Sequence, residues 1–492
     1  MNHLLSQIPQ LLAYDPAQPM LFNTGLFLVL FVIFMFLYLV VKGHRLLKML
    51  LVIAFSLYFY YKSGSWCVYI LCGVCVSDYA LGRLLGVTRR DIWRRAIVLL
   101  NVAVNVGMLV YFKYFNLLYE AFCSIVSTSF EPLDVILPAG ISFFTFRSIS
   151  YMVDVYRGDL EPCRNFLDYF FFLTFFPPLL AGPVVRARDM LGQIRENPSA
   201  IREMISEGLF LIMTGLVKKV MIADYISANF VDRIFDNPAL YSGFENLMGA
   251  IGFTVQLYCD FSGYSDMAIG LALLMGYRFK INFDAPFKSQ SPTEFWRRWH
   301  ISLSTWLRDY VYIPLGGNRH GRARAYLNQF LTMVIGGFWH GASWMYVIWG
   351  AYHGLLLVAH KVISKVWKLP EGLAGRPEVK ALNIAITFML VVAGFTLFRA
   401  PDLETVAVMG QQIFGDFHLS VLPQFVEGYV LIVGALVASM AAHFTPRSWT
   451  TGTARVYEVM PVAIQAAILA LVIFLVIQTR QSEIVPFIYL QY

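Results

Sequence analysis

The chain has 492 residues, of which 58% are hydrophobic and only 14% are charged. Soluble domains carry about 25% charged residues, so this composition excludes an ordinary soluble globular protein. The formal net charge at pH 7 is +7, and we expect no nucleic-acid partner.

Apolar runs recur from one end of the chain to the other and predict an all-α fold, a polytopic bundle of transmembrane helices. A helix needs roughly 20 apolar residues to cross the hydrocarbon core, and several of the runs are shorter than this. We therefore expect about 11 to 13 crossings, some of them broken or re-entrant. The expected spans lie near residues 20–41, 48–61, 64–82, 96–112, 134–152, 166–181, 206–222, 245–260, 262–277, 327–340, 343–360, 381–398, 427–442 and 460–478.

The N-terminus is predicted to lie outside the cytoplasm. Residues 1–19 contain no Lys or Arg and no small-residue cleavage site follows the first apolar run, so this run is not a cleaved signal peptide. Basic loops follow the first and third runs, whereas the link at Lys62 carries one cation, which fits the positive-inside rule. We expect a polar leader over 1–19, a core over 20–365 and C-terminal transmembrane helices over 366–492 packed on the core.

The six cysteines lie mostly within apolar runs. Cys72 and Cys75 have the C-x-x-C spacing, but no second pair and no nearby His accompany them. We therefore expect buried, unreactive thiols rather than a metal or redox site.

Positive charge is concentrated in residues 278–324, which contain nine Lys and Arg residues but only three acidic residues. This segment has two interpretations. It is a cytoplasmic loop that touches anionic lipid headgroups, or it is a vestibule that binds a phosphorylated ligand such as coenzyme A.

The segment 294–310 has the pattern of an amphipathic helix that lies at the membrane interface or along a polar cavity. Glu294 can pair with Arg297 or Arg298 one turn later, and His300 lies on the border of the apolar face. A border histidine serves as an interfacial hydrogen-bonding group or as a catalyst. The apolar arc contains Phe295, Trp296, Trp299, Leu303, Trp306, Leu307 and Tyr310.

A second histidine, His340, ends a short apolar segment within Gly336-Gly337-Phe-Trp-His-Gly341. A histidine within the membrane region is costly unless it faces water or a partner, and its near-neutral pKa suits a general base acting on an alcohol. The flanking glycines would let a backbone or an acyl chain approach closely. His353 follows thirteen residues later, and helical geometry predicts that it does not share a face with His340. No ligand spacing supports a zinc site built from these histidines.

Two further elements interrupt apolar runs with polar or helix-breaking residues. Residues 256–266 carry Asp260 and Asp266 with several hydroxyl groups, which should face the protein interior and could orient a histidine or a broken helix. Residues 176–186 contain three prolines, which predict a kinked or re-entrant helix.

These elements, in this order, resemble the membrane-bound O-acyltransferase family, and most closely its bacterial branch of alginate O-acetyltransferase-like membrane subunits. The resemblance extends from about residue 20 to residue 360 and more loosely to the C-terminus. Cys259 departs from the aromatic residue common in that branch. The matching text is LPAGISFFTFRSISYMVDVYRG (137–158), LLAGPVVRARD (179–189), QLYCDFSGYSDMAIGLALLMGYRF (256–279), TEFWRRWHISLSTWLRDYVYIPLGGNR (293–319) and GGFWHGASW (336–344).

The resemblance implies a helical funnel in which His340 is catalytic and His300 is a second active-site residue. The donor-binding candidates in the basic segment are Arg297, Arg298, Trp299 and Arg308. It implies acetyl transfer from a cytosolic thioester, acetyl-CoA or an acyl carrier, to an extracytoplasmic polysaccharide, with a periplasmic serine-hydrolase-like partner. We expect a bacterial cytoplasmic membrane location, no tightly bound cofactor and no metal. Two alternatives are D-alanyl transfer to teichoic acid and, from another class, transport of an activated sugar or lipid.

Overall fold

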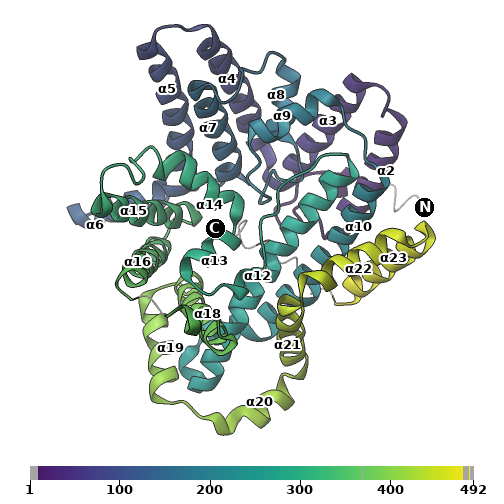
Figure 1. The fold of residues 1–492 in the computed structure, drawn as a ribbon. Helices are drawn as coiled ribbons and strands as arrows, with labels where there is room; N and C mark the ends of the chain where they lie inside the picture. The colour runs from purple at the N-terminus through teal and green to yellow at the C-terminus, as the bar shows by residue number, and fades with distance from the viewer. Residues whose placement is uncertain (1–8, 368–369, 480–486, 488–492) are drawn as a thin grey trace. The chain divides into compact units, whose positions relative to one another are not determined.

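The computed structural model describes residues 9–367, 370–479 and 487. Residues 1–8 of the expected leader, and residues 368–369, 480–486 and 488–492 of the expected C-terminal part, lie outside the described residues. Within the described part the secondary structure is helical and contains no strand, which confirms the all-α prediction (Figure 1).

The helices differ widely in length. Several continue into short π-helical segments, such as Val217–Asp224 after α10 and Arg308–Tyr312 after α14. The α-helices from α2 onward are α2 (Gly25–Val40), α3 (Arg45–Gly64), α4 (Val68–Val87), α5 (Asp91–Leu109), α6 (Phe115–Val126), α7 (Ile141–Arg157), α8 (Phe166–Thr174), α9 (Ala187–Glu196), α10 (Arg202–Leu216), α11 (Asp232–Asp236), α12 (Gly243–Leu274), α13 (Pro292–Arg298), α14 (Ile301–Leu307), α15 (Arg322–His340), α16 (Trp344–Val366), α17 (Glu371–Ala374), α18 (Pro377–Arg399), α19 (Leu403–Gly415), α20 (Leu422–Gly428), α21 (Val430–Phe444), α22 (Arg447–Val459) and α23 (Val462–Thr479).

The chain folds into two compact units. The first consists of the described residues within Met1–Leu209 together with Met267–Phe279. The second consists of Phe210–Asp266 and the described residues within Lys280–Ile488. The division falls inside α10 and α12, so these helices contribute to both units. The three-part division expected from the sequence stays a prediction.

Five helical stretches of the described chain are long and apolar enough to cross a membrane, or six if a pair bent by 99° counts as one span. The expectation of about 11 to 13 crossings also includes shorter and broken apolar segments, such as the 16-residue α2, which this count leaves out. The stretches are Arg45–Val87, Asp91–Val126, Trp344–Val366, Pro377–Arg399 and Val462–Thr479, with Leu419–Gly428 plus Val430–Phe444 as the bent pair.

Some of the expected spans belong to helices that are buried in protein, which hydropathy does not distinguish from helices that face lipid. The expected spans 245–260 and 262–277 form the single helix α12, whose apolar residues from Phe253 to Leu273 are largely buried. The expected span 134–152 corresponds to the 17-residue helix α7, which is buried on nearly every side.

The first unit has a polar centre made by four of its helices. The buried carboxylate of Asp78 on α4 accepts from the Asn101 amide of α5 at 2.6 Å and from the Tyr169 hydroxyl of α8 at 2.8 Å. Ser148 of α7 accepts from Asn105 of α5 at 2.9 Å. Neutral donors thus satisfy a carboxylate that would be costly to bury alone.

The proline-rich segment 176–186 interrupts the expected span as predicted, although it follows the end of a helix rather than kinking one. The helix α8 stops at Thr174, and residues 175–186 are buried without forming a helix. The buried guanidinium of Arg147 donates to the carbonyl oxygens of Phe172, Leu173 and Pro178. It satisfies carbonyl groups that the end of α8 leaves without helical partners.

Candidate active site

The basic aromatic segment is two short helices rather than one. Helix α13 ends at Arg298, Trp299 is extended, and α14 begins at Ile301 before a π-helical turn at Arg308–Tyr312. The expectation of one amphipathic helix over 294–310 is therefore wrong. His300 adopts the left-handed conformation, with φ 44° and ψ 54°, at the break.

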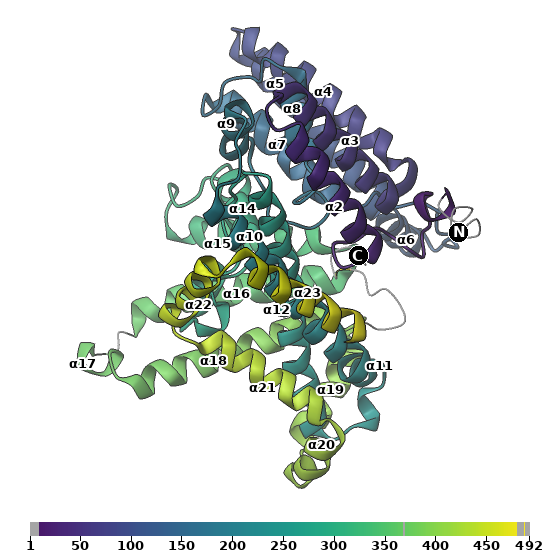
Figure 2. The ribbon, with the colours of Figure 1, turned by 90° about the vertical axis from the view of Figure 1, so that its right-hand side faces the viewer.

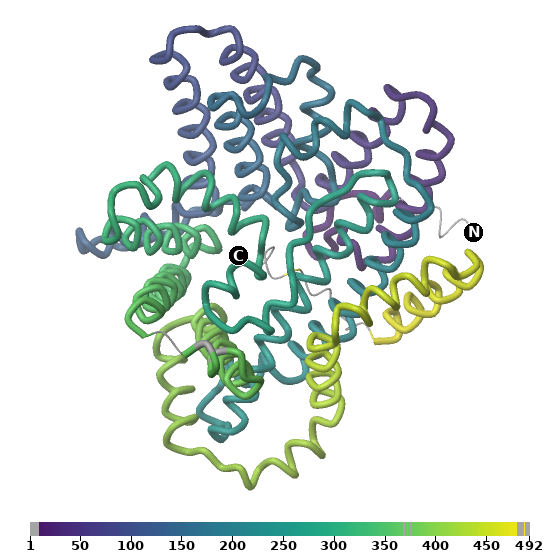
Figure 3. Tube along the Cα trace, in the orientation of Figure 1, coloured from purple at the N-terminus to yellow at the C-terminus, as the bar shows by residue number. Residues whose placement is uncertain are grey.

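The segment 282–284 beside the break explains why the chain can leave the helical path there. The amide of Asp284 donates to the carbonyl of Arg298, and the amide of Ile301 donates to the carbonyl of Asn282, both at 2.9 Å. These two bonds replace helical bonds that the break removes, so the buried backbone stays satisfied. The connection between α12 and α13, which carries Asn282 and Asp284, can be followed in Figure 3.

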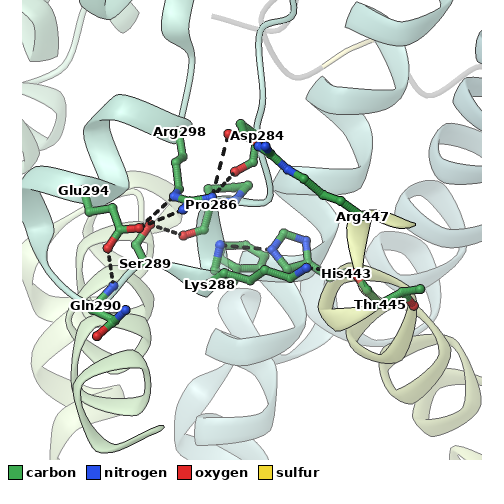
Figure 4. A network of polar contacts seen from close by, with 11 residues as sticks. Asp284, Pro286, Lys288, Ser289, Gln290, Glu294, Arg298, His443, Thr445 and Arg447 are labelled. Atoms are coloured by element: carbon green, nitrogen blue, oxygen red, sulfur yellow. Dashed lines mark hydrogen bonds and ion pairs between the residues drawn. The ribbon is translucent and has the colours of Figure 1, made fainter. Parts of the chain in front are cut away.

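Arg298 belongs to a network of ion pairs that fixes this connection (Figure 4). Its guanidinium lies 2.8 Å from Glu294, which confirms the pairing expected from their spacing, and 3.8 Å from Asp284. Arg447 of α22 also pairs with Asp284. Because two carboxylates hold the Arg298 side chain, its main contribution in the structure is to the shape of the loop.

Residues from α21 complete the network. The side chain of His443 accepts the amide hydrogen of Phe287 at 3.0 Å, and Lys288 donates to the carbonyl of Thr445 at 2.8 Å. Figure 4 shows these groups beside the Arg298 cluster. The helices expected to pack on the core thus contact the loop that leads to His300.

Trp299, a donor-binding candidate, lies in an aromatic cluster. It is 2% exposed, stacks on Phe295 at 5.5 Å between ring centroids, and contacts Phe283 at 5.0 Å and Phe395 at 4.9 Å. Its position anchors the end of α13 to α18.

A pocket of about 460 Å³ opens where α13 and α14 face α15 and α16. Arg297, Arg308 and Lys361 bring positive charge to its wall, and Asp309 pairs with Arg308 at 2.7 Å. Of the four donor-binding candidates, Arg297 and Arg308 line the pocket, whereas Arg298 and Trp299 lie in the contacts described above. The full lining is Thr293, Trp296, Arg297, Ile301, Ser304, Thr305, Leu307, Arg308, Tyr312, Gln329, Thr332, Met333, Leu357 and Lys361.

A close contact between two helices positions His340. Helices α15 and α16 lie side by side (Figures 1 and 2), and Gly337 and Gly350 face one another across the contact. A Cβ atom on Gly350 would lie 2.5 Å from the carbonyl oxygen of Met333 and 3.0 Å from the Cα of Gly337. The expectation that glycines here permit a close backbone approach is therefore confirmed.

His340 ends α15 and is 4% exposed. Its ring lies 4.9 Å from Trp349, 4.9 Å from Trp339 and 5.3 Å from Phe398, between ring centroids. The sequence suggests a water-filled surrounding, but the described neighbours are mainly aromatic, and the described pocket lining includes neither His340 nor His300. Trp296 links the two regions, since it lines the pocket and contacts Trp349 at 5.8 Å.

His300 and His340 both contact one tryptophan. The ring of Trp339 is 6.3 Å from His300 and 4.9 Å from His340, between ring centroids. His300 is fully buried and packs edge-on against Phe261 of α12 at 4.6 Å. The fold thus gathers two histidines 40 positions apart in the sequence into one cluster. His300 lies outside the candidate spans, and burial lowers its pKa to about 3, so its imidazole is neutral at pH 7.

His353 joins the same aromatic cluster, contrary to the expectation from helical rotation. The chain turns at Gly341 between α15 and α16, so one continuous helix does not connect the two histidines. Trp349 contacts His340 at 4.9 Å and His353 at 5.0 Å. The Trp296 indole donates to His353 Nδ1 at 3.4 Å.

In the part of the chain that the structure describes, no group of three or more His, Cys, Asp or Glu side chains is placed to hold a metal ion.

Sequence reasoning missed two residues of this region. Lys361 lines the pocket from the C-terminal part of the apolar helix α16, where it and Lys365 interrupt the apolar pattern and are themselves a signal. Asn282 contacts His300 from eighteen positions earlier, and its sequence context of alternating polar and aromatic residues gives no such signal.

Comparison with known proteins identifies the family of the chain. A model of the membrane-bound O-acyltransferase family matches residues 163–394. A probable alginate O-acetylase of Pseudomonas putida is 44% identical over 415 residues, covering 82% of each chain. A peptidoglycan O-acetyltransferase of Helicobacter pylori is 36% identical over 421 residues, covering 78% of each chain. A teichoic acid D-alanyltransferase of Bacillus subtilis is 29% identical over 278 residues, covering 54% of this chain and 70% of that protein. The chain therefore belongs to the membrane-bound O-acyltransferase family, and it is a multi-pass membrane O-acyltransferase.

Proposed function

We propose that this enzyme moves an acetyl group from a cytosolic thioester, acetyl-CoA, to a hydroxyl group of an extracytoplasmic polysaccharide, either directly or through a periplasmic serine-hydrolase-like partner. Relatives named for O-acetylation of alginate and of peptidoglycan support the acyl group and the class of acceptor. The enzyme would act in the bacterial cytoplasmic membrane.

The observation that carries this proposal is the pocket beside the histidine cluster. Three cationic side chains, Arg297, Arg308 and Lys361, share its wall with Ser and Thr hydroxyl groups. Phosphate oxygens of coenzyme A would accept hydrogen bonds from such groups, and charge-assisted bonds are the strongest of these. The apolar remainder of the wall suits the acyl-bearing arm of the donor.

The reaction needs little besides positioning and a base, since a thioester is already activated. The acceptor oxygen attacks the thioester carbonyl carbon while His340 takes the hydroxyl proton. The carbon–sulfur bond then breaks, and the thiolate leaves with a proton returned from His340. His300 would orient or polarise the carbonyl group.

Ring contacts lead from the pocket wall to His340, since Trp296 lines the pocket and contacts Trp349, which contacts His340. By this route the donor arm would pass the two rings to reach the base, with side-chain movement when substrate binds. Trp296→Ala should change the KM for the donor and the kcat together, because it alters both the wall of the pocket and the route from it.

D-alanyl transfer from a carrier protein is a second candidate. It is supported by the likeness to a teichoic acid D-alanyltransferase, which covers 54% of this chain against 82% for the alginate O-acetylase. Membership of an acyltransferase family favours both readings over transport of an activated sugar or lipid.

Purified protein in liposomes with radiolabelled acetyl-CoA tests the proposal. Wild-type protein should transfer label to an added polysaccharide or partner, or hydrolyse the thioester, and His340→Ala should lose about 10²- to 10⁴-fold in rate, the usual contribution of a general base. Turnover with a D-alanyl carrier protein but not with acetyl-CoA would favour the second candidate. Unchanged turnover in His340→Ala would show that His340 is not the base.

The pocket is tested separately through the KM for acetyl-CoA. Arg297→Gln and Lys361→Gln should each raise it by roughly fivefold, since one partly exposed charge-assisted bond contributes about 1 kcal/mol. Arg319→Gln is the matched control for Arg297→Gln: it removes the same charge from the same basic segment, yet Arg319 is outside the pocket lining. Equal effects of Arg297→Gln and Arg319→Gln would show that the segment acts through its net charge alone.

A further inference from the structure

Asn282 makes an unusual concentration of contacts at the break that carries His300. Its side-chain oxygen lies 3.3 Å from His300 Nδ1, 2.9 Å from the Ser302 hydroxyl and 3.2 Å from the Ser302 amide nitrogen. Its side-chain nitrogen donates to the hydroxyl of Ser265 on α12 at 3.2 Å. Asn282 is 1% exposed, so water does not compete strongly for these bonds.

The orientation of the Asn282 amide follows from one of these partners. A backbone N–H can only donate, so the group that faces the Ser302 amide must be the oxygen of Asn282. The nitrogen then faces Ser265, whose hydroxyl can accept. A flipped amide would set two N–H donors against each other in a buried site, which costs about 1–3 kcal/mol.

The same logic fixes the protonation of the imidazole. Because the Asn282 oxygen can only accept, His300 must donate to it from Nδ1. A neutral imidazole carries one ring proton, so Nε2 is left with its lone pair. The backbone bond from Ile301 to the carbonyl of Asn282 holds the two residues in register.

From this geometry we propose that Asn282 is a positioning residue for the acyl transfer: it selects the Nδ1–H tautomer of His300 and so presents Nε2 as a hydrogen-bond acceptor or base toward the reacting groups. The proposal rests on the participation of His300 in the reaction, and it narrows the proposed role to orientation of a reacting group through Nε2 as an acceptor. Polarising the thioester carbonyl would instead need the opposite tautomer, in which Nε2 is a donor. Burial, which keeps the His300 ring neutral, supports the assignment.

The charged groups on the elements packed around His300 are largely paired with one another. Asp284 pairs with Arg298 and Arg447, and Asp266 of α12 pairs with Lys218 at 2.7 Å. His300 is therefore expected to stay neutral throughout the pH range of an assay unless a new charge is introduced beside it. Asp260 pairs with Lys219, and Arg308 pairs with Asp309. The other charged or titratable groups on these elements are Lys280, Lys288, Glu294, Arg297, His340 and Tyr264.

Asn282→Asp introduces such a charge and keeps the acceptor. Its carboxylate can still accept from His300 Nδ1 and Ser302, so this variant should stay active at high pH. The carboxylate also favours the imidazolium form, so the rate should fall toward low pH at least one pH unit above any acid limb of the wild-type enzyme. Asn282→Ala removes the acceptor and should lose roughly 10- to 100-fold in kcat at every pH, as is usual when a ring-orienting partner is lost.

A purely structural role would give a different pattern, with both variants impaired in proportion to their stability and no shift in the pH profile. Equal, pH-independent rates for Asn282→Asp and Asn282→Ala in folded protein would overturn the proposal.

A second measurement needs neither activity nor a folded Asn282 variant. In ¹⁵N-histidine NMR of the full-length protein, the signals that disappear in His300→Gln should be those of a neutral Nδ1–H ring. Signals of an Nε2–H ring would refute the tautomer assignment. If instead His300→Gln retains full acetyl transfer, the proposed role of His300 in the reaction fails, while the tautomer result still stands.

Discussion

The contact between α15 and α16 should be unusually sensitive to a single methyl group. Gly350→Ala adds a Cβ atom that would lie 2.5 Å from the carbonyl oxygen of Met333, 3.0 Å from the Cα of Gly337 and 3.1 Å from the Cα of Val334. All three atoms belong to the backbone of α15, so no side-chain rotation relieves the overlap.

The size of the effect follows from two opposing terms. Overpacking a close contact costs about 1–3 kcal/mol, and a rigid backbone neighbour puts Gly350 at the upper end of that range. Replacing a glycine by alanine within a helix stabilises the helix by about 1 kcal/mol, because alanine has the higher helix propensity. We therefore expect Gly350→Ala to lower the free energy of unfolding by about 2 kcal/mol. Since α15 ends at His340, separation of the helices should also lower kcat.

Thermal unfolding in detergent, followed with a thiol-reactive dye, measures the stability term. The chain has six free cysteines, of which Cys67, Cys75, Cys123, Cys163 and Cys259 are buried, so the dye reports their exposure.

Gly410→Ala is the matched control, because Gly410 lies within α19 and a Cβ there meets no atom within 4 Å. The control should unfold at the same or a slightly higher temperature than wild type. If Gly350→Ala unfolds no earlier than Gly410→Ala, the close backbone contact inferred here is wrong.

Three further substitutions test other parts of the structure. Arg298→Gln should lower the unfolding temperature through loss of its ion pairs but leave the KM for acetyl-CoA near the wild-type value. A raised KM with unchanged stability would show that Arg298 binds the donor. Asp78→Leu leaves buried donors of α5 and α8 without an acceptor and should cost roughly 2–5 kcal/mol, whereas Asp78→Asn, which keeps one acceptor, should cost less; equal dye-monitored unfolding temperatures would contradict this. Asp402 accepts from the amide of Thr405 at 2.8 Å at the start of α19, and this bond lowers the pKa of its carboxyl group. A lowered pKa in the folded state means that its stabilisation is present above the unfolded pKa of about 3.9 and is lost as the pH falls through the lower folded value. Hydrogen exchange at the start of α19 should therefore be faster in Asp402→Ala than in wild type at pH 7, and a difference that persists undiminished at the lowest pH would rule out the charged cap.

Composition and short-range pattern were sufficient for the class of fold and for several local contacts. A chain with 14% charged residues and recurring apolar runs has few alternatives to membrane helices. The i, i+4 pair of Glu294 and Arg298 and the helix stop before the prolines at 177 and 178 depend on near neighbours in the chain. Such features are decided by spacing and backbone sterics, which a sequence displays directly.

The division of residues 245–277 and the course of the 294–310 segment depended on contacts that a sequence does not display. An apolar run shows that a segment is removed from water, but not whether protein or lipid surrounds it. Two expected spans are therefore the single helix α12, whose apolar residues are largely buried. Helical periodicity predicted no break at His300, because the segment that stabilises the break, 282–284, lies well before it in the chain.

The candidate site divides in the same way. The sequence by itself singled out His300, His340 and the basic residues as candidates, since titratable groups amid apolar residues are costly and need a reason. The family resemblance then implied active-site roles for the two histidines. Only the tertiary structure brought both histidines into contact with Trp339 and placed Asn282 beside His300. It also placed Arg297 in the pocket wall and Arg298 in the ion-pair network. The physical reason is that residue type limits what a side chain can do, whereas its partners, which fix tautomer, charge and access, come from segments that meet only when the chain folds.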